Sequence, residues 1–464
     1  MSLMVLQQCL KHLEKISAPE SWQRALPQIR AEASQFKNIL RLNEVPIYGG
    51  NTRVGHRDLE SLGPEEVQSF QQDLLSSHTL GSKPWYSERT ARAIGYAKMY
   101  ALAAGGTGIS EDLFQKVAIS TTNPDFRPLI PQFCTYSCGD VIPGAHWAKA
   151  LLAQHPAYCP GAGEVMALLN GSFVHVGYLL SLVRRLVQLG TLLIETTRIN
   201  NQVVRANRTN FDAPIQGFAR PIVEYLANEI GTTYADYRRQ DPISVRATPQ
   251  IIESFVDTVR SLHAQIDYHL QVPSSNPLFT TDINYPLSQA SFLAPALSIK
   301  SAAVIEAILF ALWASVNRTQ YLLSGQIEQI PQDGANSQSA LQFIQYPKLM
   351  MSMLERCRHV CGRRVFAAGA QTSNGVEDLW THGVEVAAQL DHLCQAGEQL
   401  LITELYVLVK TVLLFKLENQ TSMSNAILSA VCESANYQAA AEKLQMIVST
   451  ELVDIESQLS DILI

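Results

Sequence analysis

Apolar residues recur at intervals of three and four positions over unusually long stretches of this 464-residue chain. These stretches include residues 161–184, 250–269, 294–323 and 383–417. This spacing is typical of α-helices, and a helix without a fully polar face must be covered by other helices. We therefore predict a mainly α fold with a long central helix bundle. Residues 1–180 are expected to form a smaller N-terminal region that carries loops, and residues 181–464 the bundle.

The charge composition excludes several classes of protein. The net charge is −7, and charged residues make up 17% of the chain, below the usual share of about 25%. Intrinsic disorder and a strongly basic nucleic-acid-binding surface are both excluded by this composition. Few charges on so long a chain also indicate that some surface is buried in an oligomer.

Further sequence features concern membranes, metals and the cell compartment. The most apolar run, 301–316, contains Glu306 and is shorter than the ~20 residues of a membrane span, so no membrane contact is expected. Eight cysteines are spread thinly, which fits a reducing cytoplasm. They lack the paired spacing of a zinc site, and we predict no metal. Short strands are predicted only at 45–47 and around 200–204.

Irregular segments rich in Gly, Pro, Asn and Ser separate the long helices, and loops on a rigid scaffold are where sites are usually built. Four of these segments resemble, in order, the motifs of the histidine and phenylalanine ammonia-lyase family. Tyr48–Gly55 follows the family's Tyr-Gly-x-Asn-Thr-Gly-Phe-Gly except at its sixth and seventh positions. Tyr136–His146 corresponds to Gly-Ala-Ser-Gly-Asp-Leu-Ala-Pro-Leu-Ala-His. Gln240–Arg246 and Ser373–Asp378 correspond to Gln-Asp-x-Tyr-Ser-x-Arg and Ser-Ala-Asn-Gln-Glu-Asp.

The resemblance implies a cofactor made from the chain itself. In this family three consecutive residues cyclise into a methylidene-imidazolone, and the corresponding residues here are Ser137, Cys138 and Gly139. The third residue must lack a side chain because the backbone folds back tightly. The family usually has Ala-Ser-Gly, whose serine loses water, whereas Cys138 would lose hydrogen sulfide. The alternative is that Cys138 remains a thiol.

The resemblance also implies catalytic and cofactor-binding roles. Tyr48 corresponds to the tyrosine that removes the β-proton of the substrate, which requires its pKa to fall from about 10. Asn170 corresponds to the asparagine that donates to the imidazolone oxygen, and Gln240 to a glutamine near the cofactor. The alternative for Tyr48 is a buried phenol with a satisfied hydroxyl.

Three further residues are implied to bind the substrate. Arg246 corresponds to the arginine that pairs with the substrate carboxylate, for which a planar guanidinium is well suited. Asn276 corresponds to an asparagine near that carboxylate, and Phe292 to the phenylalanine of the family's Gly-Asn-Phe-His-Gly motif. The family resemblance further implies a homotetramer whose sites are shared between subunits.

Two positions bear on the choice of substrate. Ser77-His78 resembles the pair found in histidine ammonia-lyases, and Glu377 resembles a catalytic-site glutamate of the same enzymes. A carboxylate and an imidazole in the pocket favour a polar or basic side chain, because an unpaired buried carboxylate against a phenyl ring is costly. The alternative for His78 is a packed helix residue. The resemblance thus favours a histidine-like α-amino acid.

Some positions depart from the family pattern. Ile243 replaces the tyrosine of Tyr-Ser-x-Arg, and Leu293 and Ala294 replace a His-Gly pair. We therefore keep three hypotheses. The first is an ammonia-lyase, the second an aminomutase acting on an aromatic or polar α-amino acid, and the third a non-catalytic scaffold or partner descended from such an enzyme.

Overall fold

A computed structural model describes residues 3–42, 44–212, 217–230, 240–283, 285–335, 343–362, 369, 371–417 and 421–464, without the side chains of 449–451 and 454. Contacts divide the chain into two compact units. Unit 1 comprises Met1–Leu182, His263–Ile299 and Arg364–Ala388, and unit 2 comprises Val183–Leu262, Lys300–Arg363 and Gln389–Ile464. Two later segments thus join the N-terminal part of the chain in unit 1. The expected domain boundary at 180/181 remains a prediction.

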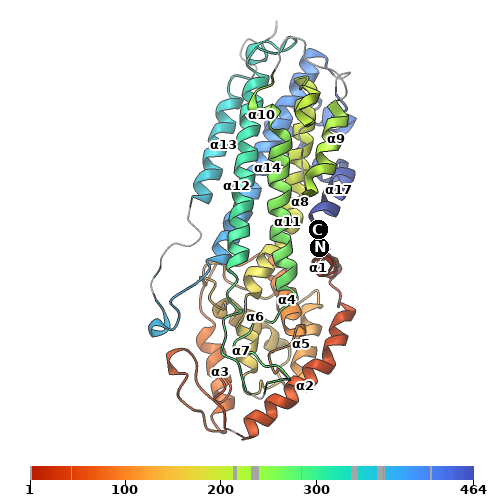
Figure 1. The fold of residues 1–464 in the computed structure, drawn as a ribbon. Helices are drawn as coiled ribbons and strands as arrows, with labels where there is room; N and C mark the ends of the chain where they lie inside the picture. Colours follow the sequence, from red (N-terminus) through yellow and green to blue (C-terminus); the bar gives the residue numbers. More distant parts are fainter. Residues whose placement is uncertain are drawn as a thin grey trace. The chain divides into compact units, whose positions relative to one another are not determined.

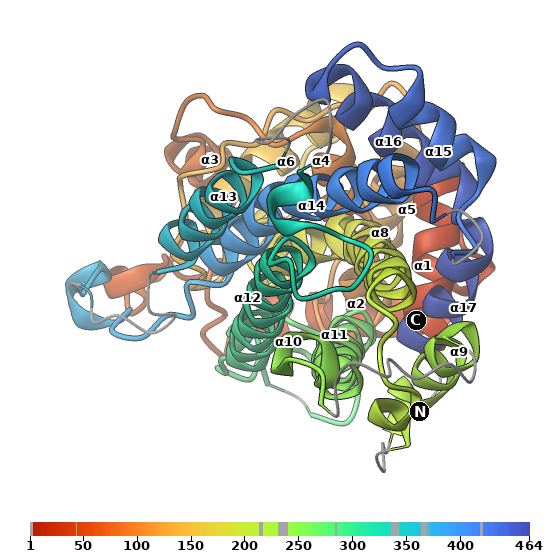
Figure 2. The same ribbon diagram turned by 90° about the horizontal axis from the view of Figure 1, so that it is seen from above.

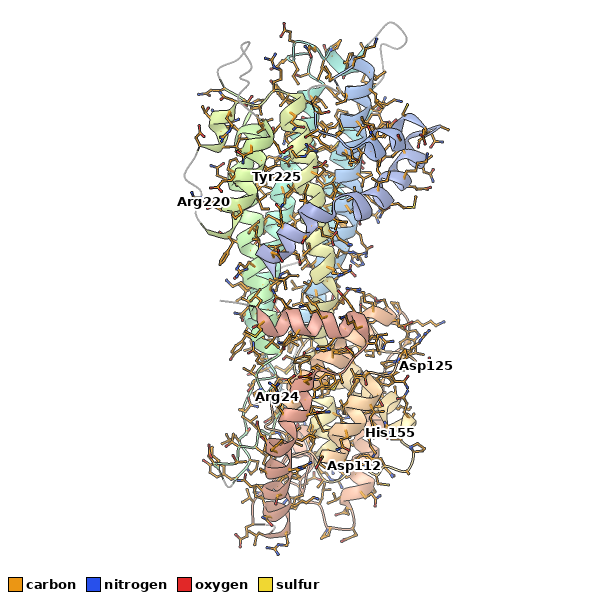
Figure 3. The ribbon with its side chains drawn as sticks, turned by 90° about the vertical axis from the view of Figure 1, so that its right-hand side faces the viewer. Arg24, Asp112, Asp125, His155, Arg220 and Tyr225 are labelled. Carbon is orange, nitrogen blue, oxygen red and sulfur yellow. The ribbon has the colours of Figure 1, made fainter. Side chains whose placement is uncertain are left out.

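Apart from one helix of 23 residues, the helices entirely within unit 1 have 16 residues or fewer and are joined by loops (Figure 1). Serines begin two of its helices, since Ser87 Oγ accepts a hydrogen bond from Thr90 N and Ser110 Oγ one from Leu113 N. The helices entirely within unit 1 are α1 (Met4–Lys15), α2 (Glu20–Leu42), η1 (Gly55–Arg57), α3 (Val67–His78), α4 (Glu88–Ala103), α5 (Glu111–Thr121), α6 (Val141–Gln154), α7 (Glu164–Leu169) and η5 (Ser373–Gly375). His155, directly after α6, lies 3.0 Å from Ser120 Oγ of α5, and Figure 3 shows it beside that helix.

Unit 2 is built on four long helices that run side by side in both ribbon views (Figures 1 and 2). These are α8 (Phe173–Val203), α11 (Thr248–His269), α12 (Pro295–Leu322) and α14 (Gly383–Phe415), each of which also contributes residues to unit 1. The remaining helices are η2 (Arg208–Phe211), η3 (Gly217–Ala219), α9 (Arg220–Ile230), α10 (Ile243–Arg246), η4 (Gln332–Gly334), α13 (Tyr346–Cys361), α15 (Asn425–Cys432), α16 (Tyr437–Glu451) and α17 (Val453–Leu463). The predicted mainly α fold with a long-helix bundle is confirmed.

Three local predictions were wrong. The stretch expected as one helix at 161–184 is α7 followed by α8, because the chain breaks at Asn170-Gly171, where Gly171 has φ +143°. The strand expected around 200–204 lies at the end of α8, whose Asn200 and Asn201 are fully buried. Tertiary packing there overrides the weak helix propensity of asparagine. The strand expected at 45–47 is not formed either, because this stretch leads into the turn at Tyr48. The described residues contain only isolated β-bridges, one of them joining Tyr48 and Thr52.

The core of the bundle is apolar but includes a fully buried ion pair. Arg318 Nε and Nη2 on α12 each donate a 3.0 Å hydrogen bond to the Glu404 carboxylate on α14, and Ser315 Oγ donates a third at 2.6 Å. Both charged side chains are at most 1% exposed. Burial of two charges is tolerable only with such complete pairing.

Two described stretches are long and apolar enough to cross a membrane by length and composition alone. They are Glu164–Val203, whose apolar window is 100% buried inside the protein, and Pro295–Leu322, whose window is 56% buried. The apolar run at 301–316 therefore belongs to a helix of 28 residues, longer than the run itself indicates. Buried core helices have the same composition, so these stretches are weak support for a membrane span.

Candidate active site

The turn at Ser137–Gly139 has an unusual backbone. Ser137, Gly139 and Asp140 all have positive φ, at 63°, 81° and 50°. Such angles are costly for residues with a side chain and persist only where the surroundings hold them. A Cβ added to Gly139 would lie 2.7 Å from Asn170 Nδ2, so only glycine fits this position. The turn is therefore closed tightly against Asn170.

Asn170 connects the Ser137–Gly139 turn to the segment that carries Asn276. Its Oδ1 accepts a 3.1 Å hydrogen bond from Asn276 N, and its carbonyl oxygen accepts one of 2.9 Å from Lys98 Nζ. A Cβ on Gly139 would also lie 3.6 Å from Phe292 Cδ2, which places the Phe292 ring against the turn. The structure thus brings together Asn170, Asn276 and Phe292, which lie far apart in the sequence.

The Cys138 thiol is half-buried beside carboxylates. Burial, with the negative charges of Glu377 and Asp140, raises the pKa of Cys138 to about 12. Asp140 itself is fully buried, and its Oδ1 accepts a 2.8 Å hydrogen bond from Thr135 Oγ1. Burial raises the pKa of Asp140 to about 6. A thiol in such surroundings is held in its neutral form.

The loop that carries Tyr48 folds over the same region. Tyr48 Oη accepts a 2.8 Å hydrogen bond from Gly55 N, across the Gly-rich turn. Burial raises the pKa of Tyr48, and the charges of Glu377 and Asp58 raise it further, while the Gly55 N–H opposes them. The expectation that its surroundings lower this pKa does not hold for the chain with an intact Cys138 thiol. The charge of Glu377 raises the pKa of both Tyr48 and Cys138.

Glu377 is held in place by two hydroxyl groups. Its Oε2 accepts hydrogen bonds from Tyr136 Oη at 2.6 Å and from Thr372 Oγ1 at 2.5 Å. The Tyr136 ring packs on Trp380, with ring centroids 4.8 Å apart. Tyr136 was not predicted as a site residue, although it stands next to Ser137 where the family motif has glycine. The tyrosine in place of the family's glycine was the sequence feature that could have identified Tyr136 as a site residue.

His78 makes hydrogen bonds at the end of its own helix. Its Nδ1 donates to Leu74 O at 2.8 Å and lies 3.1 Å from Ser77 Oγ at the end of α3. These contacts fit the alternative of a packed helix residue. A role of His78 in substrate binding remains a prediction.

Gln240 and Arg246 belong to unit 2, where they line a polar cavity of about 490 Å³. Asn207 and Asn210 also line it. The Asp241 carboxylate holds Asn207 and Asn210 in place, because its Oδ2 accepts hydrogen bonds from Asn207 N at 2.7 Å and Asn210 Nδ2 at 2.6 Å. The cavity offers a guanidinium and several amides, a donor set that suits a carboxylate.

An apolar cavity of about 630 Å³ lies beside it in unit 2. Ile243, which stands where the family motif has tyrosine, is 63% exposed there. Phe310 and Trp313 of α12 line the same cavity and are 47% and 48% exposed. A contiguous exposed apolar surface of this kind is typical of a binding or interaction site.

The turn in unit 1 fits a cofactor built from Ser137, Cys138 and Gly139. The third residue is at a position that excludes a side chain, and the amide of Asn170 lies against it. Ser137 is held by its backbone N–H, which donates to Thr135 Oγ1 at 3.0 Å. These residues are therefore compatible with a ring formed from the three residues.

Comparisons with known proteins identify the family and the fold. The family model for aromatic amino acid lyases matches residues 6–436. A histidine ammonia-lyase from Vibrio cholerae is 24% identical over 345 residues, and the match covers 66% of this chain and 66% of the relative, just under two thirds of its length. The crystal structure of a tyrosine aminomutase from Streptomyces globisporus has a TM-score of 0.82 at 18% identity, covering 97% of this chain and 96% of that one. Ergothionase, an ergothioneine-degrading enzyme from Treponema denticola, gives 0.83 at 15% identity, covering 97% and 98%.

Proposed function

Since the chain belongs to the aromatic amino acid lyase family, we propose that it is a carbon–nitrogen lyase that eliminates ammonia from an α-amino acid. The observation that carries this proposal is the Ser137–Gly139 turn, closed against Asn170 at a position where only glycine fits. The turn would yield a methylidene-imidazolone, which supplies an electrophile for the amine of the substrate. Asn170 and Gln240 would hold this group.

Tyr48 is proposed as the base that takes the β-proton at its Oη. Proton abstraction needs the phenolate, and the Gly55 N–H that donates to Oη stabilises it. Burial is the main cause of the raised pKa of Tyr48, so formation of the phenolate depends on this N–H donor.

Glu377 is proposed to receive the side chain of the substrate. Tyr136 and Thr372 both donate to its Oε2, which fixes the carboxylate. Within the part of the chain that the structure describes, no hydrogen bond to Oε1 is formed, so that oxygen can accept from an N–H donor of the substrate. His78 is proposed to lie on the same pocket. The histidine ammonia-lyases among the relatives favour the same conclusion, and we propose a histidine-like substrate. Arg246 and Asn276 would bind the substrate carboxylate, with Phe292 against the cofactor.

The chain is proposed to act as a cytoplasmic homotetramer. The exposed Phe310 and Trp313 on α12 support burial of this face in an assembly, since water contact with two large aromatic rings is unfavourable. Light scattering coupled to gel filtration measures the mass of the assembly. A monomer at micromolar concentration would contradict this proposal.

The test of the proposed function combines mass and product analysis. Formation of the cofactor should make the intact chain about 52 Da lighter, through loss of one water and one hydrogen sulfide. The purified chain is then given L-histidine, L-phenylalanine and L-tyrosine, and 2-enoic acids and ammonia are measured. A β-amino acid product would indicate an aminomutase instead. An unmodified mass without any product would favour the non-catalytic scaffold.

A further inference from the structure

The segment 381–384 lies directly on the residues that would cyclise. Thr381 Oγ1 donates a 3.1 Å hydrogen bond to the carbonyl oxygen of Ser137. His382 N donates to Tyr136 O at 3.0 Å, and Val384 N donates to Ser137 Oγ at 3.0 Å. Thr381 and Ser137 are each 4% exposed. Water therefore does not compete for these bonds.

The Ser137 carbonyl is the group on which ring closure acts. When the Gly139 nitrogen attacks its carbon, negative charge develops on its oxygen, and a donor aimed at that oxygen in a buried site stabilises the transition state. We infer that Thr381 is a catalytic residue for cofactor formation, and that its hydroxyl acts as the oxyanion donor for closure of the Ser137-Cys138-Gly139 ring. This inference rests on the proposed function.

The remaining contacts of the turn agree with this role. The carbonyl oxygen of Gly139 accepts a 3.0 Å hydrogen bond from Gly171 N. Among the described residues, no hydrogen bond is formed by the N–H of Gly139 itself, so its nitrogen is not tied to another acceptor. Hydrogen bonds thus hold the carbonyl groups of Ser137 and Gly139, while the Gly139 nitrogen remains available as the nucleophile.

The reaction balances without an oxidant. A bond forms between Gly139 N and the carbonyl carbon of Ser137, and the carbonyl oxygen leaves as water with the amide protons of Gly139 and Cys138. Cys138 then loses its Cα proton and its thiolate together as hydrogen sulfide, which leaves a carbon–carbon double bond. Thr381 acts on the first of these steps. Loss of the Thr381 hydroxyl should therefore leave the chain at its encoded mass, and a form that has lost only water should not accumulate.

The experiment follows the intact mass of the full-length chain over time after a short induction. Thr381→Val keeps the shape of the side chain but lacks the hydroxyl, and we expect the conversion to the form about 52 Da lighter to slow about 100-fold. Thr381→Ser restores the hydroxyl and should convert at nearly the rate of the unsubstituted chain. Thr411→Val is the matched control, because Thr411 is equally buried and its hydroxyl donates only to Val407 O of its own helix.

Helix content and the unfolding midpoint are measured on the same samples, and only the folded fraction is scored. Thr381→Ala is a second variant in case the valine prevents folding. Conversion of both hydroxyl-free variants at the unsubstituted rate would overturn the role of Thr381 and leave the proposed function intact. An encoded mass in the unsubstituted chain would overturn both.

Discussion

The turn at 137–139 and the segment at 240–246 were predicted from motifs of similar quality, but their surroundings differ. The turn is enclosed within unit 1, in contact with Asn170 and with the segment that carries Thr381. Arg246 and Gln240 instead line an open polar cavity in unit 2, and Gln240 is exposed. The turn at 137–139 has the contacts that covalent chemistry on the backbone requires. The segment at 240–246 has the solvent access that a site for an incoming carboxylate requires.

This difference leads to separable effects of substitution. Changes in the turn should abolish cofactor formation and activity together. Changes in the cavity should weaken substrate binding while the mass of the chain remains that of the processed form. The following predictions test this separation, beginning with the largest expected effect.

Gly139→Ala should have the largest effect. A Cβ here would lie 2.7 Å from Asn170 Nδ2, and a φ of 81° costs alanine about 1–2 kcal/mol. We expect no mass loss and a decrease in activity of at least about 1,000-fold. Gly161→Ala is the control, because its Cβ would meet Glu164 Oε2 only at 3.6 Å. A fully processed Gly139→Ala chain would show that the turn is not the cofactor segment.

Tyr48→Phe should separate catalysis from cofactor formation within unit 1. The phenol oxygen is lost but the ring remains, so the chain should still become about 52 Da lighter, while kcat falls about 10²- to 10⁴-fold. Mass spectrometry and steady-state kinetics measure the two effects on one preparation. Tyr268→Phe, at a side chain that is 54% exposed, serves as the control. Unchanged kcat in Tyr48→Phe would exclude this residue as the base.

Arg246→Lys should act on substrate binding alone. Lysine keeps the charge but not the two parallel donors, and loss of a charge-assisted hydrogen bond of about 1.5–3 kcal/mol corresponds to a rise in KM of about 10- to 100-fold. Intact mass and the unfolding midpoint should not change. Arg220→Lys, at an exposed arginine of α9 labelled in Figure 3, should leave KM unchanged. Loss of cofactor formation in Arg246→Lys would contradict the separation of the two segments.

The sequence predicted the helices of the bundle and most of the cluster in unit 1, because apolar spacing and motif order are both local properties of a chain. It did not predict the break at Asn170-Gly171 from helix periodicity, since apolar residues continue on both sides of it. The contacts of Thr381 with Ser137 and of Lys98 with Asn170 could not be predicted either. They join residues far apart in sequence and depend on how three segments meet.

Lys98 illustrates such a contact and gives the smallest expected effect. Lys98 is 2% exposed, and its Nζ donates to Asn170 O at 2.9 Å and lies 4.3 Å from the centroid of the Phe173 ring. Burial lowers the pKa of Lys98 from 10.5 to about 7. The unfolded chain therefore holds this proton between pH 7 and 10.5, whereas the folded chain has released it. Stability should consequently rise with pH across this window.

Lys98→Met removes the ionisable group and should flatten this dependence. We expect the free energy of unfolding in urea to increase by about 1 kcal/mol less between pH 7 and pH 8 in Lys98→Met than in the unsubstituted chain. Lys149→Met, at an exposed lysine of α6, should retain the full dependence. Equal pH slopes for Lys98→Met and the unsubstituted chain would mean that Lys98 keeps its proton in the folded state. Lys98 would then be a buried positive charge that is paired with the carbonyl dipole of Asn170. The Ser137–Gly139 turn would in that case lie close to a permanent positive charge.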